Sequence, residues 1–222
     1  MDKSYIEREY RSMIVRFEYY LGDILTIVSQ NTNLGFEGNA FYYHNTHTRF
    51  PELLPKQMNL LWAGTQVKTR MCEIGFNAGH SALLMLNGCP AASKIEFTIF
   101  DIGHHNYTKP CIDYVQSQFP NVTFEYIEGN SIVKMGDFIQ QRPAVSRTYD
   151  VVHVDGGHTL ECITADFAHA SKLVRKGGII IVDDTNIEYI DTVVNRAIES
   201  GDFIEVECFP TVGYQHRIIQ SR

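Results

Sequence analysis

Residues 70–88 read RMCEIGFNAGHSALLMLNG, in which a short apolar run passes through two glycines into a stretch with helical spacing. A second apolar run, residues 95–100, follows after a short connection. A strand, a glycine turn, a helix and a second strand in this order predict a βαβ unit with parallel strands. The same alternation continues to about residue 200. The predicted strands are residues 70–74, 95–100, 122–127, 149–154 and 178–183, and the predicted helices are residues 80–88, 107–119, 131–141, 159–175 and 188–200.

Repeated βα units predict an α/β fold with a doubly wound, Rossmann-like sheet that helices cover on both faces. We expect the helix of residues 159–175 to end at VRKGG, with Gly177 as its left-handed cap and the fifth strand just after it. The apolar runs EVECFP (205–210) and GYQHRII (213–219), joined by a short turn, predict a terminal β-hairpin. The expected sheet is therefore seven-stranded and mostly parallel, with a C-terminal β-hairpin.

The pattern of apolar residues changes near residue 66, where the regular alternation of apolar runs and helical stretches begins. Residues 4–30 place apolar side chains at helical spacing, and PELLPKQMNLLWAG (51–64) predicts a helix that begins after a proline. We therefore expect an N-terminal helical arm or lid over residues 1–66 and a Rossmann-like domain over residues 67–222.

Between the two helices of this arm lies a turn-rich stretch, residues 31–50, with many aromatic side chains. It could line a substrate pocket, although packing of an aromatic loop on the core is the favoured interpretation. The arm could also form the interface of a homo-oligomer. The pocket candidates are Tyr42, Tyr43, His44 and His47.

Composition narrows the classes of function. The chain has 222 residues, with 19 Lys or Arg against 26 Asp or Glu and a formal net charge of −7. This sign disfavours binding to the phosphate backbone of nucleic acid. The charged N-terminus lacks the apolar core of a signal peptide and the longest apolar runs have strand length, so we expect neither secretion nor a membrane span. Five cysteines without a CxxC pair are typical of reduced thiols, which favours a cytoplasmic location.

The glycine turn is the first candidate binding site, because ligands of doubly wound sheets bind at the carboxyl ends of the strands. Gly75 and Gly79 permit a tight turn there, and the following helix offers N–H groups to an anion. The alternative is an ordinary turn, and the spacing matches neither a nicotinamide site nor a P-loop. Asp101 ends the second predicted strand, where a carboxylate can hold two ribose hydroxyls, unless it only caps the strand. Together these residues predict a nucleoside cofactor.

A second candidate site lies at the ends of the fourth and fifth predicted strands, VVHVDGGH and IIIVDDTN. We expect these strands to be neighbours, so that Asp155, Asp183 and Asp184 converge. Such carboxylates repel one another, so protons or a cation must balance them, and oxygen ligands favour Mg²⁺. Alternatively, one or two of the three cap helices. His158 follows at the start of the next helix as a candidate general base, or as a solvent-facing residue.

These motifs resemble the class I S-adenosylmethionine-dependent methyltransferases, in particular the cation-dependent small-molecule O-methyltransferases, over residues 70–186. CEIGFNAGHSA is similar to the first motif of that family, and the pair Asp183-Asp184 is closer to its macrolide-sugar branch than to its catechol branch. The catechol branch has a lysine base where this chain has His158. The resemblance implies that the cofactor residues are Glu73, Gly75, Phe76, Asn77, Gly79, Ser81, Asp101, Ser131 and Asp155, and that Asp155, Asp183 and Asp184 bind the metal.

The function expected from this resemblance is S-adenosylmethionine-dependent O-methylation of a small-molecule hydroxyl, on a vicinal diol, a sugar or a catechol-like compound. Asp155 and His158 would be the catalytic residues, with Mg²⁺ or another hard divalent cation. Two alternatives stay open, a non-catalytic cofactor-binding protein of the same fold and an NAD-dependent oxidoreductase.

Overall fold

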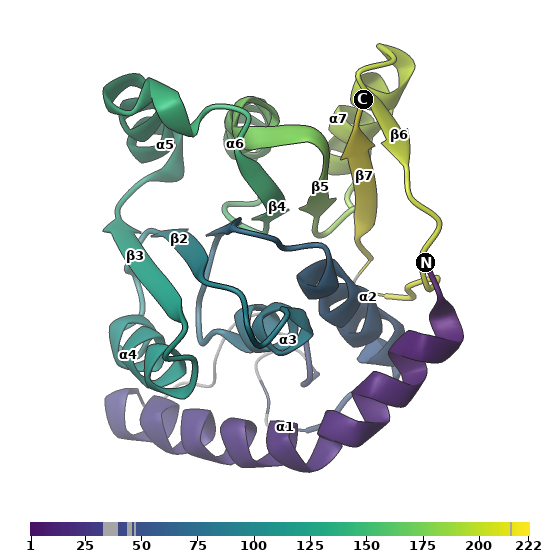
Figure 1. The fold of residues 1–222 in the computed structure, drawn as a ribbon. Coiled ribbons are helices and arrows are strands. Elements are labelled where there is room, and N and C mark those ends of the chain that lie inside the picture. Colours follow the sequence, from purple (N-terminus) through teal and green to yellow (C-terminus); the bar gives the residue numbers. More distant parts are fainter. Residues whose placement is uncertain (33–39, 44–45, 47, 214) are drawn as a thin grey trace.

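Seven strands form one sheet in the order β3-β2-β1-β4-β5-β7-β6 (Figure 1). Strands β1 to β5 are parallel, whereas β7 runs antiparallel between β5 and β6. The computed structural model describes residues 1–32, 40–43, 46, 48–213 and 215–222. The expected fold class is confirmed. The strands are β1 (Arg70–Ile74), β2 (Ile95–Asp101), β3 (Val122–Glu128), β4 (Tyr149–Val154), β5 (Val174–Val182), β6 (Phe203–Glu205) and β7 (Arg217–Ser221).

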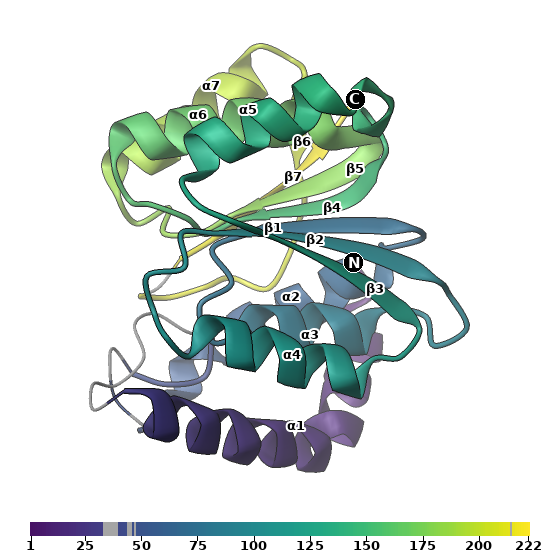
Figure 2. The same cartoon turned by 90° about the vertical axis from the view of Figure 1, so that its left-hand side faces the viewer.

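Helices cover both faces of this sheet, and a further helix lies outside one of the two helical layers (Figure 2). One face carries α5 (Ser131–Gln141), α6 (Leu160–Leu173) and α7 (Glu188–Glu199). The other face carries α2 (Leu54–Thr65), α3 (His80–Gly88) and α4 (Thr108–Gln118), with α1 (Lys3–Asn31) packed beneath them. Short 3-10 turns occupy Pro51–Leu53 and Pro143–Val145. In the described ranges, no helix combines the length and the apolar character needed to cross a membrane.

Alternate residues of the central strands supply the two hydrophobic cores. In β1, Met71 packs toward the α1–α4 side, whereas Cys72 and Ile74 pack toward the α5–α7 side. This alternation is the period of two that places neighbouring side chains on opposite faces of a strand. The predicted arm shares the first core with the sheet, through buried residues at helical spacing along α1. They are Ile6, Tyr10, Phe17, Leu21, Ile24 and Val28.

The start of β5 corrects one prediction. Helix α6 ends at Leu173, and VRKGG belongs to the strand rather than to the end of the helix. Val174 is buried and pairs with Tyr149 of β4, and Gly177, with φ of +71°, lies within β5, where pairing with β4 is irregular. The Arg175 side chain donates to Asp150 across a distance of 2.6 Å. These contacts with β4 outweigh the helix-end signal in the sequence.

The C-terminal strands were also misplaced by the sequence. The antiparallel pair exists, but it comprises residues 203–205 and 217–221, and residues 206–216 connect the two strands instead of a short turn. Phe209 leaves the sheet because its backbone N–H and carbonyl both bond to the side chain of Asn59 on α2, each at 2.9 Å.

Helices α2 and α3 cross at two glycines. A Cβ atom added to Gly64 would lie 1.9 Å from the carbonyl oxygen of Met85, and one added to Gly88 would lie 2.0 Å from the carbonyl oxygen of Leu61. Non-bonded carbon and oxygen atoms do not approach each other so closely, so neither glycine leaves room for a side chain. The two helix backbones are therefore in direct contact. This crossing fixes α2 against the helix that follows the glycine turn.

We expect Gly64→Ala to lower the free energy of unfolding by roughly 1–3 kcal/mol, because the added methyl group forces the two helices apart. Gly22→Ala on α1 is the matched control, since no atom lies within 4 Å of its added Cβ. In a helix this control should be neutral or stabilising by up to about 1 kcal/mol. Urea unfolding measures both variants, and equal effects would show that the crossing is not tightly packed.

Candidate active site

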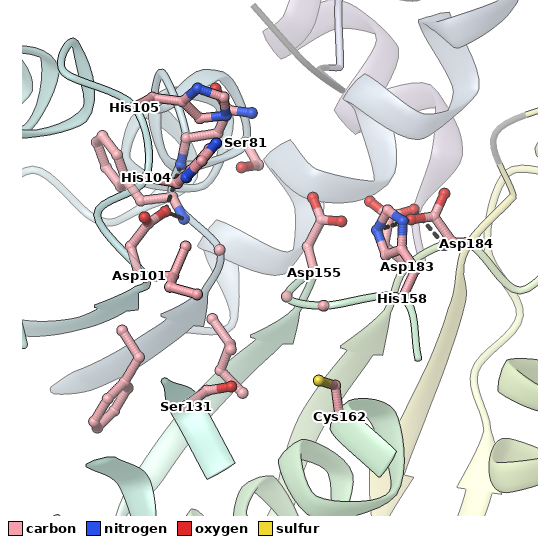
Figure 3. Close-up of a pocket in the computed structure, with 18 of the residues that line it drawn as sticks. Ser81, Asp101, His104, His105, Ser131, Asp155, His158, Cys162, Asp183 and Asp184 are labelled. Carbon is pink, nitrogen blue, oxygen red and sulfur yellow. Dashed lines mark hydrogen bonds and ion pairs between the residues drawn. The ribbon is translucent and has the colours of Figure 1, made fainter. Parts of the chain in front are cut away.

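A cavity of about 750 Å³ opens at the carboxyl ends of β1, β2, β4 and β5. In Figure 3, Asp101, His104 and His105 lie at one end, Asp183 and Asp184 lie at the other, and Asp155 lies between them. Its volume is within the range of small-molecule and cofactor sites. The cavity thus joins the two candidate sites of the sequence into one. Further lining residues are Ala40, Lys56, Gly75, Phe76, Asn77, Ser81, Ser131, His158, Cys162 and Asn186.

The glycine turn after β1 forms one wall of this cavity. Gly75, Asn77 and Gly79 have positive φ of 86°, 52° and 83°. A Cβ atom on Gly75 would lie 1.9 Å from the backbone oxygen of Asp155, so only glycine allows this approach of β1 to the end of β4. The Phe76 ring occupies the space beside Gly79. Phe76 and Asn77, both predicted cofactor residues, line the cavity, with their backbones turned by these glycines.

Asp101 braces this turn from the end of β2. Its Oδ2 accepts the backbone N–H groups of Phe76 and Asn77, each at 2.9 Å, and its Oδ1 accepts that of Gly103 at 2.8 Å. The side chain faces the cavity, so Oδ1 has a second lone pair to offer a ligand hydroxyl. The sequence predicted that this carboxylate binds ribose, and in the structure it orders the glycine turn.

Glu73 lies behind the cavity wall. It is fully buried, and its Oε1 accepts from the Ser81 hydroxyl at 2.6 Å and lies 2.9 Å from His153 Nδ1. Burial opposes the charge on His153, but the neighbouring carboxylates of Asp183 and Glu73 outweigh it and raise the pKa of His153 to about 10. Glu73 therefore balances a buried imidazolium and positions Ser81, which itself lines the cavity.

Ser131 lies at the cavity's edge, where α5 begins. The preceding residue, Asn130, caps this helix by accepting the N–H of Ile132 at 3.0 Å. Asp166 of α6 is buried nearby, and its burial raises its pKa to about 6, an effect that Ser131 reduces. Ser131, a predicted cofactor residue, thus stands at a helix start with a buried carboxyl group behind it.

At the acidic end, Asp183 is buried between two cationic side chains. Lys56 Nζ from α2 lies 2.6 Å from Asp183 Oδ1, and His153 Nε2 lies 3.6 Å from Asp183 Oδ2. Burial alone would raise the pKa of Asp183, but Lys56 and His153 hold it well below its usual range. The protein itself supplies cations to the carboxylates that the sequence brought together.

Asp184 and His158 form a second ion pair at the rim of the cavity, with His158 Nε2 2.8 Å from Asp184 Oδ2. Asp184 has φ of +55°, and its backbone N–H donates to Asp183 Oδ1 at 2.9 Å. The hydrogen bond that His158 donates to the Asp184 carboxylate raises the pKa of His158 to about 9, although burial opposes it. His158 is therefore mostly protonated at neutral pH, which weakens its predicted role as the base.

Asp155 differs from its acidic neighbours because no hydrogen bond reaches its side chain from the part of the chain that the structure describes. It is half-buried and lines the middle of the cavity. Burial and the charge of Asp183 raise the pKa of Asp155 well above its ordinary value, although His153 and Lys56 oppose the shift. An exposed lone pair and a raised pKa are the properties of a general base.

The donor set fits the implied Mg²⁺ ion poorly. Among the described residues, ligand atoms come within 4.8 Å of one another in two groups, one of His153, Asp155 and Asp183 and one of Asp155, His158 and Asp184. The predicted triad is thus divided between them. Asp183 is already paired with Lys56, and Asp184 with His158. Mg²⁺ is usually held by one or two carboxylates and several waters, and of the predicted triad these ion pairs leave Asp155 alone without a cationic partner.

Residues 72–185, just over half of the chain, match the family model described as a methyltransferase domain. The chain belongs to this methyltransferase family. The resemblance and the enzyme class expected from the sequence are confirmed. No protein among the curated sequences matches.

Solved methyltransferase structures share the fold. CalS11, described as a TDP-rhamnose 3'-O-methyltransferase of calicheamicin biosynthesis, superposes with a TM-score of 0.58 at 12% identity, over 74% of this chain and 76% of that one. An O-methyltransferase from Klebsiella pneumoniae, described as putative in function, gives a TM-score of 0.53 at 17% identity, over 91% of this chain and 89% of that one. At these identities the likeness concerns the fold alone.

Sequence reasoning missed three groups of this methyltransferase's site. Lys56 was part of a predicted helix, and its signal was one lysine among LLPKQMNLLW. His153 lay inside a predicted strand, where VVHV contains a single polar residue. Cys162 lines the cavity from α6.

Among the aromatic and histidine residues predicted as pocket candidates, Tyr42 is buried against His80, and burial lowers the pKa of His80 to about 3. His44 and His47 lie outside the described residues.

Proposed function

We propose that the protein transfers a methyl group from S-adenosylmethionine to a hydroxyl oxygen of a small molecule. The observation that supports this most is the single cavity in which the glycine turn and Asp101 lie at one end and the acidic cluster at the other, with Asp155 between them. A cofactor at the first end and an acceptor at the second would meet beside Asp155. The family match supports the same reaction class.

The cofactor end fits a nucleoside with a charged amino-acid tail. The turn from Gly75 to Ala78 exposes backbone, Asp101 Oδ1 retains an acceptor lone pair, and Ser131 marks the opposite edge. Ile102 adds an exposed apolar surface beside Asp101, on which the adenine ring of the cofactor could stack. When bound, S-adenosylmethionine supplies an electrophilic methyl group on a sulfonium.

Asp155 is our candidate for the base. The acceptor hydroxyl would give its proton to the Asp155 carboxylate while its oxygen bonds to the methyl carbon. The carbon–sulfur bond would break at the same time, and its electron pair would stay on sulfur, which leaves as a neutral thioether. A carboxylate with a raised pKa takes this proton more readily than an ordinary one. The ion pair of His158 and Asp184 closes the far side, where it orients the acceptor by hydrogen bonding.

The acceptor end is polar, which favours a hydroxyl-rich acceptor such as a sugar or a vicinal diol over a flat catechol. Lys56, Asp155, His158, Asp184 and Asn186 all line it. A fold neighbour, CalS11, is described as acting on a nucleotide-linked sugar, which agrees with this proposal. The magnesium ion implied by the resemblance has no part in this proposal, and none of these steps passes through a metal.

The first test measures thermal stability with S-adenosylmethionine, its demethylated product or NAD, and then methyl transfer from labelled cofactor to a panel of sugars, diols and phenols. A ligand at a hundredfold its Kd should add about 2.7 kcal/mol of apparent stability. We expect stabilisation by the methionine cofactor and labelled product from a hydroxyl-rich acceptor. Stabilisation by NAD alone would favour an oxidoreductase, and binding without transfer to any acceptor would favour a non-catalytic protein.

A further inference from the structure

Lys56 is a buried cation that the N-terminal arm delivers to the acidic end of the cavity. Its side chain is 8% exposed, and its Nζ lies 2.6 Å from Asp183 Oδ1. It also lines the cavity, close enough for its charge to act on Asp155 and Asp184. Lys56 comes from a segment of the chain remote from the methyltransferase motifs, 127 residues before Asp183.

Its position is fixed by the helix that carries it. The neighbouring Gln57 donates to the backbone oxygen of Ala40 at 2.7 Å, and Asn59 makes the two bonds to Phe209 described above. The crossing at Gly64 holds the other end of α2 against α3. Lys56 therefore cannot swing away from Asp183 as a surface lysine could.

The carboxylates at this end need positive charge. Like charges about 4 Å apart repel by on the order of 4 kcal/mol at an effective dielectric near 20, and a divalent cation is the usual remedy. Here Asp183 Oδ1 already accepts from Lys56 and from the backbone N–H of Asp184, and Asp183 Oδ2 faces His153. A metal ion would have to displace a buried ammonium to bind Oδ1, and at Oδ2 it would lie beside the His153 imidazolium.

We propose that Lys56 takes the place of a divalent cation at this cluster: its ammonium balances the carboxylates and points its remaining N–H donors into the acceptor end of the cavity. An ammonium has three donors, and within the described residues Asp183 is its hydrogen-bond partner. An acceptor oxygen that loses its proton to Asp155 would then meet a fixed positive charge. This second role depends on the proposed function, whereas the exclusion of metal does not.

Manganese binding tests the proposal without any turnover. We expect electron paramagnetic resonance of the purified protein with Mn²⁺ to show weak binding for the wild type and binding about tenfold tighter or more for Lys56→Met, because the variant has one uncompensated carboxylate. Lys56→Gln, which is also neutral, should behave as Lys56→Met does. Lys68→Met is the matched control, since Lys68 is exposed and lies outside the cavity, and it should bind Mn²⁺ as the wild type does.

Activity gives the second readout. Wild-type methyl transfer should be unchanged by EDTA, whereas Lys56→Met should lose about a hundredfold in kcat and recover part of it with Mn²⁺ or Mg²⁺. Tight Mn²⁺ binding to the wild type, or wild-type activity abolished by EDTA, would overturn the proposal. If no acceptor is ever methylated but Mn²⁺ binding still rises in both neutral variants, the cation replacement stands and the proposed function fails.

Discussion

Asp155→Asn should lower kcat for methyl transfer by about 10²- to 10⁴-fold, the usual contribution of a general base. Asparagine has the shape of aspartate, so the backbone contact between residue 155 and Gly75 survives. The amide cannot take the acceptor's proton. Because the glycine turn and Asp101 are untouched, the Kd for S-adenosylmethionine should change little. Single-turnover kinetics with labelled cofactor and calorimetric titration measure the two quantities separately.

Glu161→Gln is the control for this prediction. Glu161 is an exposed acid in the first turn of α6, so its removal changes net charge equally without touching the cavity. Its kcat should equal that of the wild type. The competing candidate for the base is His158. If His158→Gln lowered kcat by about 10²- to 10⁴-fold while Asp155→Asn had a mild effect, the His158 imidazole would be the group that takes the proton.

Gly75→Ala should weaken cofactor binding and destabilise the fold. At φ of +86° any side chain is strained, and its Cβ would lie 1.9 Å from the backbone oxygen of Asp155. Strain in this region of φ and ψ costs about 1–3 kcal/mol, and the steric contact adds to it by forcing β1 and β4 apart at the cavity. Thermal unfolding should show the destabilisation, and titration with S-adenosylmethionine should show a loss of affinity of about tenfold or more.

Gly201→Ala separates the two causes. Gly201 has nearly the same φ, +83°, but no atom lies within 4 Å of its added Cβ. It should show the backbone strain alone and keep full cofactor affinity. If both variants lose the same stability and neither loses affinity, the approach of the glycine turn to Asp155 is not needed for binding.

The central sheet was predictable because its signals are local. Strand β1, helix α3, helix α5 and strand β4 have the predicted bounds, since apolar runs, glycines and helical spacing lie within each segment. The start of β5 was not predictable in this way. VRKGG contains a good helix end, and only its pairing with β4 makes it a strand.

The residues of the candidate site likewise fall into those with a local sequence signal and those without one. Asp101, Asp155 and the pair Asp183-Asp184 stand at strand ends, where topology alone brings them to one cavity. Lys56 and His153 could not be assigned, because their partners are remote in sequence: Lys56 lies 127 residues from Asp183, and His153 lies 80 residues from Glu73. The expectation of an external cation was therefore made without knowledge of Lys56 and His153 as neighbours of Asp183.

The contacts of α2 also set the order in which the chain can mature during translation. A ribosome releases the chain from its N-terminus, so Asn59 emerges 150 residues before Phe209, whose backbone bonds both the oxygen and the nitrogen of the Asn59 side-chain amide. Lys56 likewise cannot form its ion pair until Asp183 has been synthesised. Until then the polar side chains that α2 buries in the native state have no partners. The apolar face of the helix also stays exposed, where chaperones can bind it and where it can aggregate. The arm is made first, but it is among the last elements to reach its native packing.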